Sequence, residues 1–370
     1  MRKFITKINY LIKKFNFKDI KKADVLILDE QTYFNFNEYT ISRLYENINF
    51  KYIFKSTLRF LLNKTSISDS FFIEYIKQTN PKICISSEIS QQSFKSKKYF
   101  KNITSITHQI ATYWPLYKDI VKKRYKGFKT DIFLLHSEDY RDYFNFLTKK
   151  FYVVGSLSNN QKPFISSKKK PKFDIMFISE FRKKNNDYLG TNKNLSDISF
   201  AMACSSYLIK LLKKYCEKRK KTMVIALASN RKEKHSISRD DEIEFYKRDF
   251  PKVKFTKKNS LSLASETELS ICLTSNLGPE LISRKQKVLF LNVNHFFLDW
   301  ELFKKKSNIG LHWYKGNNEK IIFKKLDSLL NMKKEIWEKK LKRFNNNLPY
   351  DFKNKKILKI IRSVLKEKYK

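Results

Sequence analysis

Four short apolar runs in the second half of the chain decide the fold: FDIMFIS (173–179), TMVIALAS (222–229), LSICLTS (269–275) and KVLFLNV (287–293). Each is rich in aliphatic residues and too short to form a complete buried helix, so each predicts a buried strand. A shorter run, VKFTK (253–257), is a further strand candidate, and longer helical patterns lie between several of these runs. Strands that alternate with helices predict a parallel sheet built from βαβ units.

The first half of the chain repeats this alternation. Its strand candidates are ADVLILD (23–29), KICISS (82–87), NITSITH (102–108), TDIFLLHS (130–137) and FYVVGS (151–156). A polar stretch with two prolines and a lysine cluster, residues 159–172, separates the two series and predicts a linker. We therefore predict an α/β protein with two doubly wound, Rossmann-like domains facing each other across a cleft, where ligands bind at the carboxyl ends of strands.

The composition excludes several classes of protein. A chain of 370 residues with 41% apolar residues can bury two cores. Its four cysteines show no metal or redox spacing, which is typical of buried thiols in a reducing compartment. The longest apolar run, Met223–Ala228, is far too short to span a membrane, and lysines interrupt the apolar residues near the N-terminus, so we expect no signal peptide and a cytoplasmic protein.

The net charge of +42 has two interpretations. The lysines are spread along the whole chain, and many Lys, Asn, Ile, Phe and Tyr with few Gly and Pro are typical of an AT-rich genome, which favours a compositional origin. A selected charge would suit nucleic acid, a polyanionic substrate or an anionic membrane surface. Phe4, Ile8, Leu11, Ile12 and Phe15 share one helical face, so peripheral contact with the inner membrane stays open beside packing on the protein itself.

One of only six glycines, Gly278, follows a predicted strand directly. With Gly278 as N-cap and Pro279 at the first helical position, the N–H groups of Gly278, Glu280 and Leu281 would be free to bind an anion at the positive end of a helix. The turn Thr274–Glu280 therefore predicts either a phosphate site or an ordinary helix cap.

The segment SNLGPELISRKQKVLFLN (275–292) resembles a signature of bacterial surface-carbohydrate biosynthesis proteins with the GT-B glycosyltransferase fold, although Asn276 stands where Thr is usual. FYVVGSLSNN (151–160), FDIMFISEFR (173–182) and WEKKLKRFNNNLPYD (337–351) are similar to further segments of that family, in the same order. The resemblance implies an acceptor-side domain (1–160), a nucleotide-sugar-binding domain (161–335) and C-terminal helices (336–370) that pack back on the first domain.

The resemblance also implies a function: transfer of a sugar from a nucleotide-activated donor, the co-substrate, to a glycan or lipid-linked acceptor of the capsule or lipopolysaccharide, without a metal. Ser275, Asn276 and Gly278 would then hold the donor phosphate, Glu280 a ribose or sugar hydroxyl, and Arg182 would face the diphosphate. Transfer of a polyol phosphate from a CDP-linked donor is a close alternative.

The catalytic base is a separate question. His108 ends a predicted strand, and a neutral imidazole there can take the proton of an acceptor hydroxyl. The family often has Gln-Asn-Gly here, whereas this chain has His-Gln-Ile. Carboxylates that follow strands are rival bases: Asp29, Glu30 and Glu88.

Motifs of other enzyme classes are absent from the sequence. We find no P-loop, no dinucleotide fingerprint, no nucleophile elbow, and no spacing that predicts a metal site or an organic cofactor. No nucleic-acid reader motif is present, so we expect no specific nucleic-acid partner. A basic nucleic-acid-binding protein and an inactive scaffold homologue stay as non-enzymatic alternatives.

Overall fold

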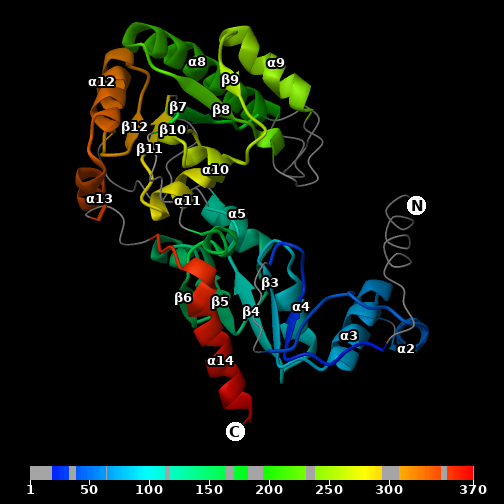
Figure 1. Ribbon diagram of the computed structural model, residues 1–370. Helices are drawn as coiled ribbons and strands as arrows, with labels where there is room; N and C mark the ends of the chain where they lie inside the picture. Colours follow the sequence, from blue (N-terminus) through cyan, green and yellow to red (C-terminus); the bar gives the residue numbers. More distant parts are fainter. Residues whose placement is uncertain are drawn as a thin grey trace. The chain divides into compact units, whose positions relative to one another are not determined.

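The computed structural model divides into two compact units. The first comprises residues 1–163 and 349–370, and the second residues 164–348. The structure describes residues 19–32, 39–63, 65–112, 117–163, 171–181, 195–230, 238–293, 308–342 and 348–369. Each unit holds one parallel sheet, as the sequence predicts (Figure 1).

The first unit contains a six-stranded sheet in the order β2-β1-β3-β4-β5-β6, with every neighbouring pair parallel. Its strands are β1 (Val25–Ile27), β2 (Ile41–Arg43), β3 (Ile83–Ser87), β4 (Thr104–His108), β5 (Ile132–Leu135) and β6 (Phe151–Val153). Sequence patterns miss β2, because a three-residue strand at a sheet edge is too short to show a period.

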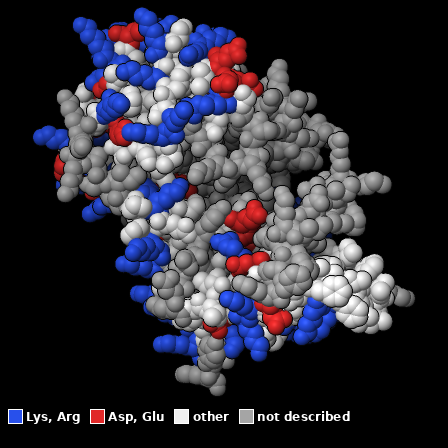
Figure 2. All heavy atoms as spheres, turned by 45° about the vertical axis from the view of Figure 1, so that its right-hand side comes forward, with Lys and Arg blue, Asp and Glu red and all other residues white. Residues whose placement is uncertain are grey.

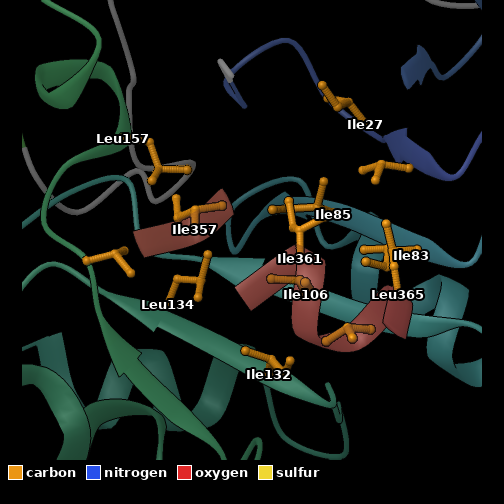
Figure 3. Close-up of a cluster of buried hydrophobic side chains, with 13 residues drawn as sticks. Ile27, Ile83, Ile85, Ile106, Ile132, Leu134, Leu157, Ile357, Ile361 and Leu365 are labelled. Carbon is orange, nitrogen blue, oxygen red and sulfur yellow. The ribbon is translucent and has the colours of Figure 1, made fainter. Parts of the chain in front are cut away.

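Two layers of side chains cover this sheet. Ile27, Ile85 and Ile106 lie in the cluster that packs against the C-terminal helix α14 (Lys355–Tyr369) (Figure 3). On the opposite face, Leu26 packs with the helices α2 (Phe50–Asn63) and α3 (Ile67–Thr79). Alternate residues of a strand point to opposite faces, so β1, which is buried on both sides, is apolar throughout.

The remaining helices of the first unit are short. They are α4 (Gln92–Tyr99), α5 (Tyr117–Arg124), the 3₁₀ turn η1 (Glu138–Tyr140), α6 (Arg141–Phe144), α7 (Leu157–Asn160) and the 3₁₀ turn η4 (Phe352–Asn354). Side chains from α4, α5 and α6 form an aromatic-rich cluster with β5, in which Phe133 and Phe144 are stacked with their ring centroids 4.3 Å apart.

The second unit contains a sheet in the order β12-β11-β10-β7-β8-β9, again parallel throughout. Its strands are β7 (Phe173–Ile178), β8 (Met223–Ala226), β9 (Lys254–Phe255), β10 (Thr267–Cys272), β11 (Val288–Asn292) and β12 (Trp313–Lys315). Its helices are α8 (Leu195–Arg219), the 3₁₀ turn η2 (Ala228–Asn230), α9 (Arg239–Asp249), α10 (Ser260–Ala264), α11 (Leu277–Ser283), α12 (Glu319–Leu330) and α13 (Lys334–Lys342). β12 is the second strand that the sequence patterns miss.

The chain returns to the first unit later than expected, at residue 349 instead of residue 336. The helix α13 belongs to the second unit, where the Trp337 indole Nε1–H donates to Lys285 O over 3.0 Å. Only residues from Pro349 onward join the first unit. There the Asn160 Nδ2 group donates to Asn354 Oδ1 over 2.9 Å, and Asp351 N donates to Asn160 Oδ1 over 2.9 Å.

Candidate functional site

Polar side chains gather at the carboxyl edge of the first sheet. Asp29 follows β1, Ser87 and Glu88 lie at the end of β3, His108 ends β4 and His136 follows β5. All except Asp29 are buried, and Asp29 is partly buried. Parallel strands bring these positions to one edge, so residues that are far apart in the sequence lie together there.

Asp29 accepts four hydrogen bonds at this edge. Its Oδ1 atom accepts from Thr32 N (2.9 Å) and Thr32 Oγ1 (2.6 Å), and its Oδ2 atom accepts from Ser87 N (2.7 Å) and Ser87 Oγ (2.5 Å). Burial by itself raises the pKa of Asp29, but the electrostatic interaction with His108, which is strongest when the ring is protonated at low pH, and these hydrogen bonds have the larger opposite effect. The pKa of Asp29 therefore lies below its ordinary value. Asp29 is therefore an ionised structural anchor, and its lone pairs are engaged.

The network determines which nitrogen of His108 carries the proton. Thr32 has one hydroxyl proton, which it donates to the ionised Asp29, so its lone pair accepts from His108 Nε2–H over 2.7 Å. The neutral ring is then the Nε2–H tautomer, and Nδ1 is the atom that can take a proton. Nδ1 lies 3.2 Å from Gln109 O, which would accept the N–H of the protonated ring.

The environment keeps His108 neutral near pH 7. Burial lowers the pKa of this imidazole more strongly than the carboxylate of Asp29 raises it. A neutral ring is what a proton acceptor requires. However, Nε2 is occupied by Thr32, Nδ1 lies against Gln109 O, and the side chain is only 2% exposed. His108 could therefore act as a base only through Nδ1, and that role stays a prediction.

The rival bases differ in their surroundings. Glu88 is fully buried, and its Oε1 atom accepts from Ile110 N over 3.2 Å. Glu30 is exposed. Gln109 was not singled out by the sequence patterns, yet its side chain joins the ends of two strands, because Oε1 accepts from His136 N (3.0 Å) and Nε2 donates to Ala111 O (2.6 Å).

The turn Thr274–Glu280 lies at the carboxyl end of β10, as expected, but its geometry differs from the predicted cap. The helix α11 begins at Leu277 with Asn276 as N-cap, two positions earlier than predicted. Gly278 N donates to Ser275 O over 2.9 Å and Glu280 N to Asn276 O over 3.3 Å. These two amides are therefore used within the turn, and the expectation that they are free to bind an anion was wrong.

The glycine at position 278 has a packing reason instead. A Cβ atom added there would lie 2.5 Å from Cε1 of Phe290 and 2.8 Å from Sγ of Cys272. Real Cβ atoms do not come that close to other heavy atoms, so only glycine lets α11 lie against β10 and β11. Ser275, Asn276 and Glu280 are partly buried and lie around the start of this helix.

Two buried carboxylates that the sequence patterns missed organise the second edge. Glu180, which follows β7, accepts hydrogen bonds from both N and Oγ1 of Thr274 and so joins the ends of β7 and β10. Glu242 on α9 accepts from Ser179 Oγ (2.5 Å), from Ala228 N (2.8 Å) and from Ser229 N (2.9 Å). No sequence pattern singles out either residue, because only the fold shows which strand ends they meet.

A buried amide at the end of β11 stands out. Asn292 is 8% exposed, and within the described chain its Nδ2 group has no hydrogen-bond partner. A buried donor without a partner costs about 1–3 kcal/mol, so such a group often marks the place of a ligand or an ordered water. The Asn at the end of this strand is part of the resemblance noted above, but its side chain was not chosen as a site residue.

The other candidate residues are quickly placed. Arg182, the expected contact of the diphosphate, lies outside the described residues. His312 is buried, and burial lowers its pKa to about 3. Among the residues that the structure describes, no group of His, Cys, Asp or Glu could hold a metal ion. No helix in the described part of the chain is long and apolar enough to cross a membrane.

Two six-stranded parallel sheets, each with polar groups at its carboxyl edge, define an α/β protein of the GT-B-like class. A family model described as "putative O-antigen biosynthesis protein" matches residues 116–365, and the chain belongs to that family. The resemblance to surface-carbohydrate biosynthesis proteins is thus confirmed. No curated protein matches the sequence.

Solved structures share the fold over nearly the whole chain. A "putative UDP-N-acetylglucosamine 2-epimerase" from Listeria monocytogenes is 12% identical, with a TM-score of 0.54 over 95% of this chain and 98% of its own. S. aureus MnaA with UDP is 10% identical, with a TM-score of 0.51 over 94% and 97%. The UDP-GlcNAc 2-epimerase of Methanocaldococcus jannaschii, in complex with UDP-GlcNAc and UDP, is 11% identical, with a TM-score of 0.51 over 92% and 99%. At these identities the similarity shows the fold.

The Asp29 network can be tested by the substitution Asp29→Asn. An amide has one acceptor oxygen, so donors of Thr32 or Ser87 would face an NH₂ group, and we expect a loss of about 3 kcal/mol in the free energy of unfolding. Urea denaturation followed by circular dichroism measures it. The exposed Asp119 is the matched control, and Asp119→Asn should change little. Equal effects of the two substitutions would show that the network does not stabilise the unit.

Buried histidines make stability depend on pH. Burial lowers the pKa of His136 and of His312 to about 3, whereas an unfolded histidine titrates near pH 6.5. Below that pH the unfolded chain binds more protons, so each histidine should cost about 2 kcal/mol of stability at pH 5 relative to pH 7.5. Urea denaturation at both pH values checks this. His136→Gln should remove part of the pH dependence, and an unchanged slope in that variant would contradict the assignment.

The packing role of Gly278 predicts the effect of Gly278→Ala. The added methyl group overlaps Phe290, so we expect a loss of about 1–3 kcal/mol in the stability of the second unit. Adding Phe290→Leu removes the ring and should recover part of that loss, which a double-mutant cycle of thermal or urea denaturation measures. If the stability losses of Gly278→Ala and Phe290→Leu simply add in the double variant, residues 278 and 290 are not in close contact.

Proposed function

We propose that the protein is a glycosyltransferase of O-antigen assembly, which moves a sugar from a nucleotide-activated donor to a growing surface glycan. The family match supports the pathway. The observation that carries the proposal is the group of polar residues around the start of α11, at the carboxyl end of β10. Ligands of open parallel sheets bind at such strand ends, and solved structures of the same fold contain UDP.

The second unit would hold the donor. Ser275 and Asn276 precede α11 and can donate hydrogen bonds to phosphate oxygens at the positive end of the helix. Glu280 would accept from a ribose or sugar hydroxyl, because a carboxylate opposes a phosphate placed beside it. Arg182 would add positive charge against the diphosphate. Gly278 would contribute indirectly, since it lets the helix approach the sheet.

The unpartnered amide of Asn292 extends this proposed site. Its Nδ2 group is buried at the end of β11, the strand against which α11 packs. A hydroxyl or carbonyl oxygen of the donor would satisfy it, and binding would then remove the cost of a buried donor without a partner. A site built to hydrogen-bond a ligand oxygen strongly rejects analogues that lack it.

The first unit would supply the acceptor side. As the nucleotide leaves, the acceptor hydroxyl loses its proton to a base, for which the neutral His108 offers Nδ1. Thr32 and Asp29 would keep the ring in this tautomer. Glu88 is the rival base at the same edge, since its buried carboxylate follows the neighbouring strand.

Epimerisation of a nucleotide sugar is a second candidate function. The specific observation that favours it is the match to UDP-GlcNAc 2-epimerases over more than 90% of both chains. The two reactions differ in a measurable way, because an epimerase changes the sugar nucleotide without an acceptor. A transferase releases the nucleotide only when an acceptor is present, apart from slow hydrolysis.

Nucleotide binding is the first test. We expect titration calorimetry with UDP, GDP, CDP and CMP to detect at least one ligand, and Glu280→Ala and Asn292→Ala to weaken it by about tenfold or more, the equivalent of one or two buried hydrogen bonds. Glu319→Ala is the matched control, because Glu319 at the start of α12 forms an exposed ion pair with Lys214 on α8. A folded protein that binds none of these nucleotides or their sugar conjugates at millimolar concentration would overturn the proposal.

The reaction type is settled by incubating the protein with the sugar nucleotide that binds, with and without lipid-linked glycan. A mass increase of the glycan supports transfer of a sugar, and an increase that includes phosphate identifies a polyol-phosphate transferase. Conversion of the free sugar nucleotide to its epimer without acceptor would replace the transferase by the second candidate.

A further inference from the structure

The helix α2 exposes an apolar face to solvent. Phe50, Phe54, Leu58, Leu61 and Leu62 are 72%, 61%, 43%, 67% and 71% exposed. Their spacing of three and four residues places them on one side of the helix. We call these five residues the α2 apolar face. Monomeric proteins rarely leave so many large apolar side chains together in water, so the face marks an interaction surface.

The opposite side of α2 holds the helix firmly on the first unit. Tyr52 and Ser56 are fully buried, and the Tyr52 hydroxyl donates to Phe71 O over 2.8 Å. The ring of Tyr52 also packs edge-on against Phe71 and Tyr75 on α3, with centroid distances of 5.6 Å in both pairs. The orientation of α2 is therefore determined by its buried side, and the apolar face cannot turn inward.

The charges beside the apolar face indicate its partner. Lys51 and Lys55 are exposed on α2, and the sequence FKYIFKSTLRFLLN contains no acidic residue. The chain as a whole carries a net charge of +42. In the charge-coloured surface, uncharged side chains gather over α2 and α3 with basic residues nearby (Figure 2). Apolar residues flanked by lysines are the composition of helices that lie in the interface of an anionic membrane.

We propose that the α2 apolar face docks the protein on an anionic phospholipid surface. Phe50, Phe54 and the three leucines enter the boundary between headgroups and acyl chains, while Lys51 and Lys55 contact lipid phosphates. This surface belongs to a structural element other than the strand ends of the proposed catalytic site. The inference holds whichever reaction the protein catalyses, so it stands or falls separately from the proposed function.

Vesicle flotation of the full-length protein tests this docking. We expect binding to phosphatidylcholine vesicles that contain phosphatidylglycerol, and much weaker binding to phosphatidylcholine alone. Phe54→Ser/Leu61→Ser should weaken binding by at least about tenfold, because two large apolar side chains no longer enter the membrane. Lys51→Glu/Lys55→Glu should weaken binding to the anionic vesicles and reduce its sensitivity to salt.

The matched control is Ile120→Ser/Ile336→Ser, which removes two apolar side chains with 54% and 47% exposure on other helices and should leave vesicle binding unchanged. Absence of binding to the anionic vesicles at low salt, or equal binding of Phe54→Ser/Leu61→Ser and the wild type, would overturn the proposal. If the wild type is a dimer in sedimentation velocity and Phe54→Ser/Leu61→Ser is a monomer, the face binds a second copy of the chain, and the proposal is overturned. If Phe54→Ser/Leu61→Ser lowers the melting temperature much more than the control does, the chain itself covers the face, and the proposal is also overturned.

Discussion

A parallel sheet must be covered on both faces, and this constraint governs the architecture of the first unit. Every residue of β1, β3 and β5 is buried, so neither face can be left in water. The helices that lie between the strands cover the face of Leu26 and part of the opposite face. The rest is covered by α14, whose Ile357, Ile361 and Leu365 pack on β1, β3 and β4. The helix α14 near the end of the chain is therefore part of the same core as β1.

The same parallel arrangement concentrates polar groups at one edge of each sheet. At the end of a strand, backbone N–H groups and polar side chains no longer have partners within the sheet. If they are buried without a hydrogen bond, the folded state loses stability. Asp29 and Glu242 meet that demand in their units, each as a buried or partly buried carboxylate that accepts several hydrogen bonds. Such carboxylates also hold other groups in defined positions: Asp29 holds His108 through Thr32, and Glu180 holds Thr274 in the turn before α11.

Some polar residues of the candidate site have all their polar atoms in hydrogen bonds within the protein, and others do not. This difference changes which residues are candidates for binding a ligand. Asp29 was a rival base on sequence grounds, but its oxygens are engaged by four donors. Gly278 was a candidate phosphate contact, but its amide donates within the turn and its missing side chain makes room for Phe290. Asn292 was passed over, yet it holds a buried amide group without a partner among the described residues. Reactivity in such a site belongs to the groups whose hydrogen bonds are incomplete.

The sequence by itself determined the two parallel sheets, because aliphatic runs of five to eight residues separated by helical patterns have few other ways to bury themselves. It also indicated the strand ends at His108 and at Thr274–Glu280. It missed β2 and β12, which are too short to show a period, and it placed the return of the chain at 336, although α13 is held by Trp337 in the second unit.

Only the tertiary structure decided which polar residues meet. The partners of Asp29 lie both nearby in the chain, at Thr32, and far along it, at Ser87, while Glu180 bonds Thr274 across two strand ends. Such contacts depend on strand order, which local patterns do not encode. For the same reason the apolar face of α2 looks like an ordinary core stripe in the sequence. The packing of Tyr52 on α3 determines that this stripe faces solvent.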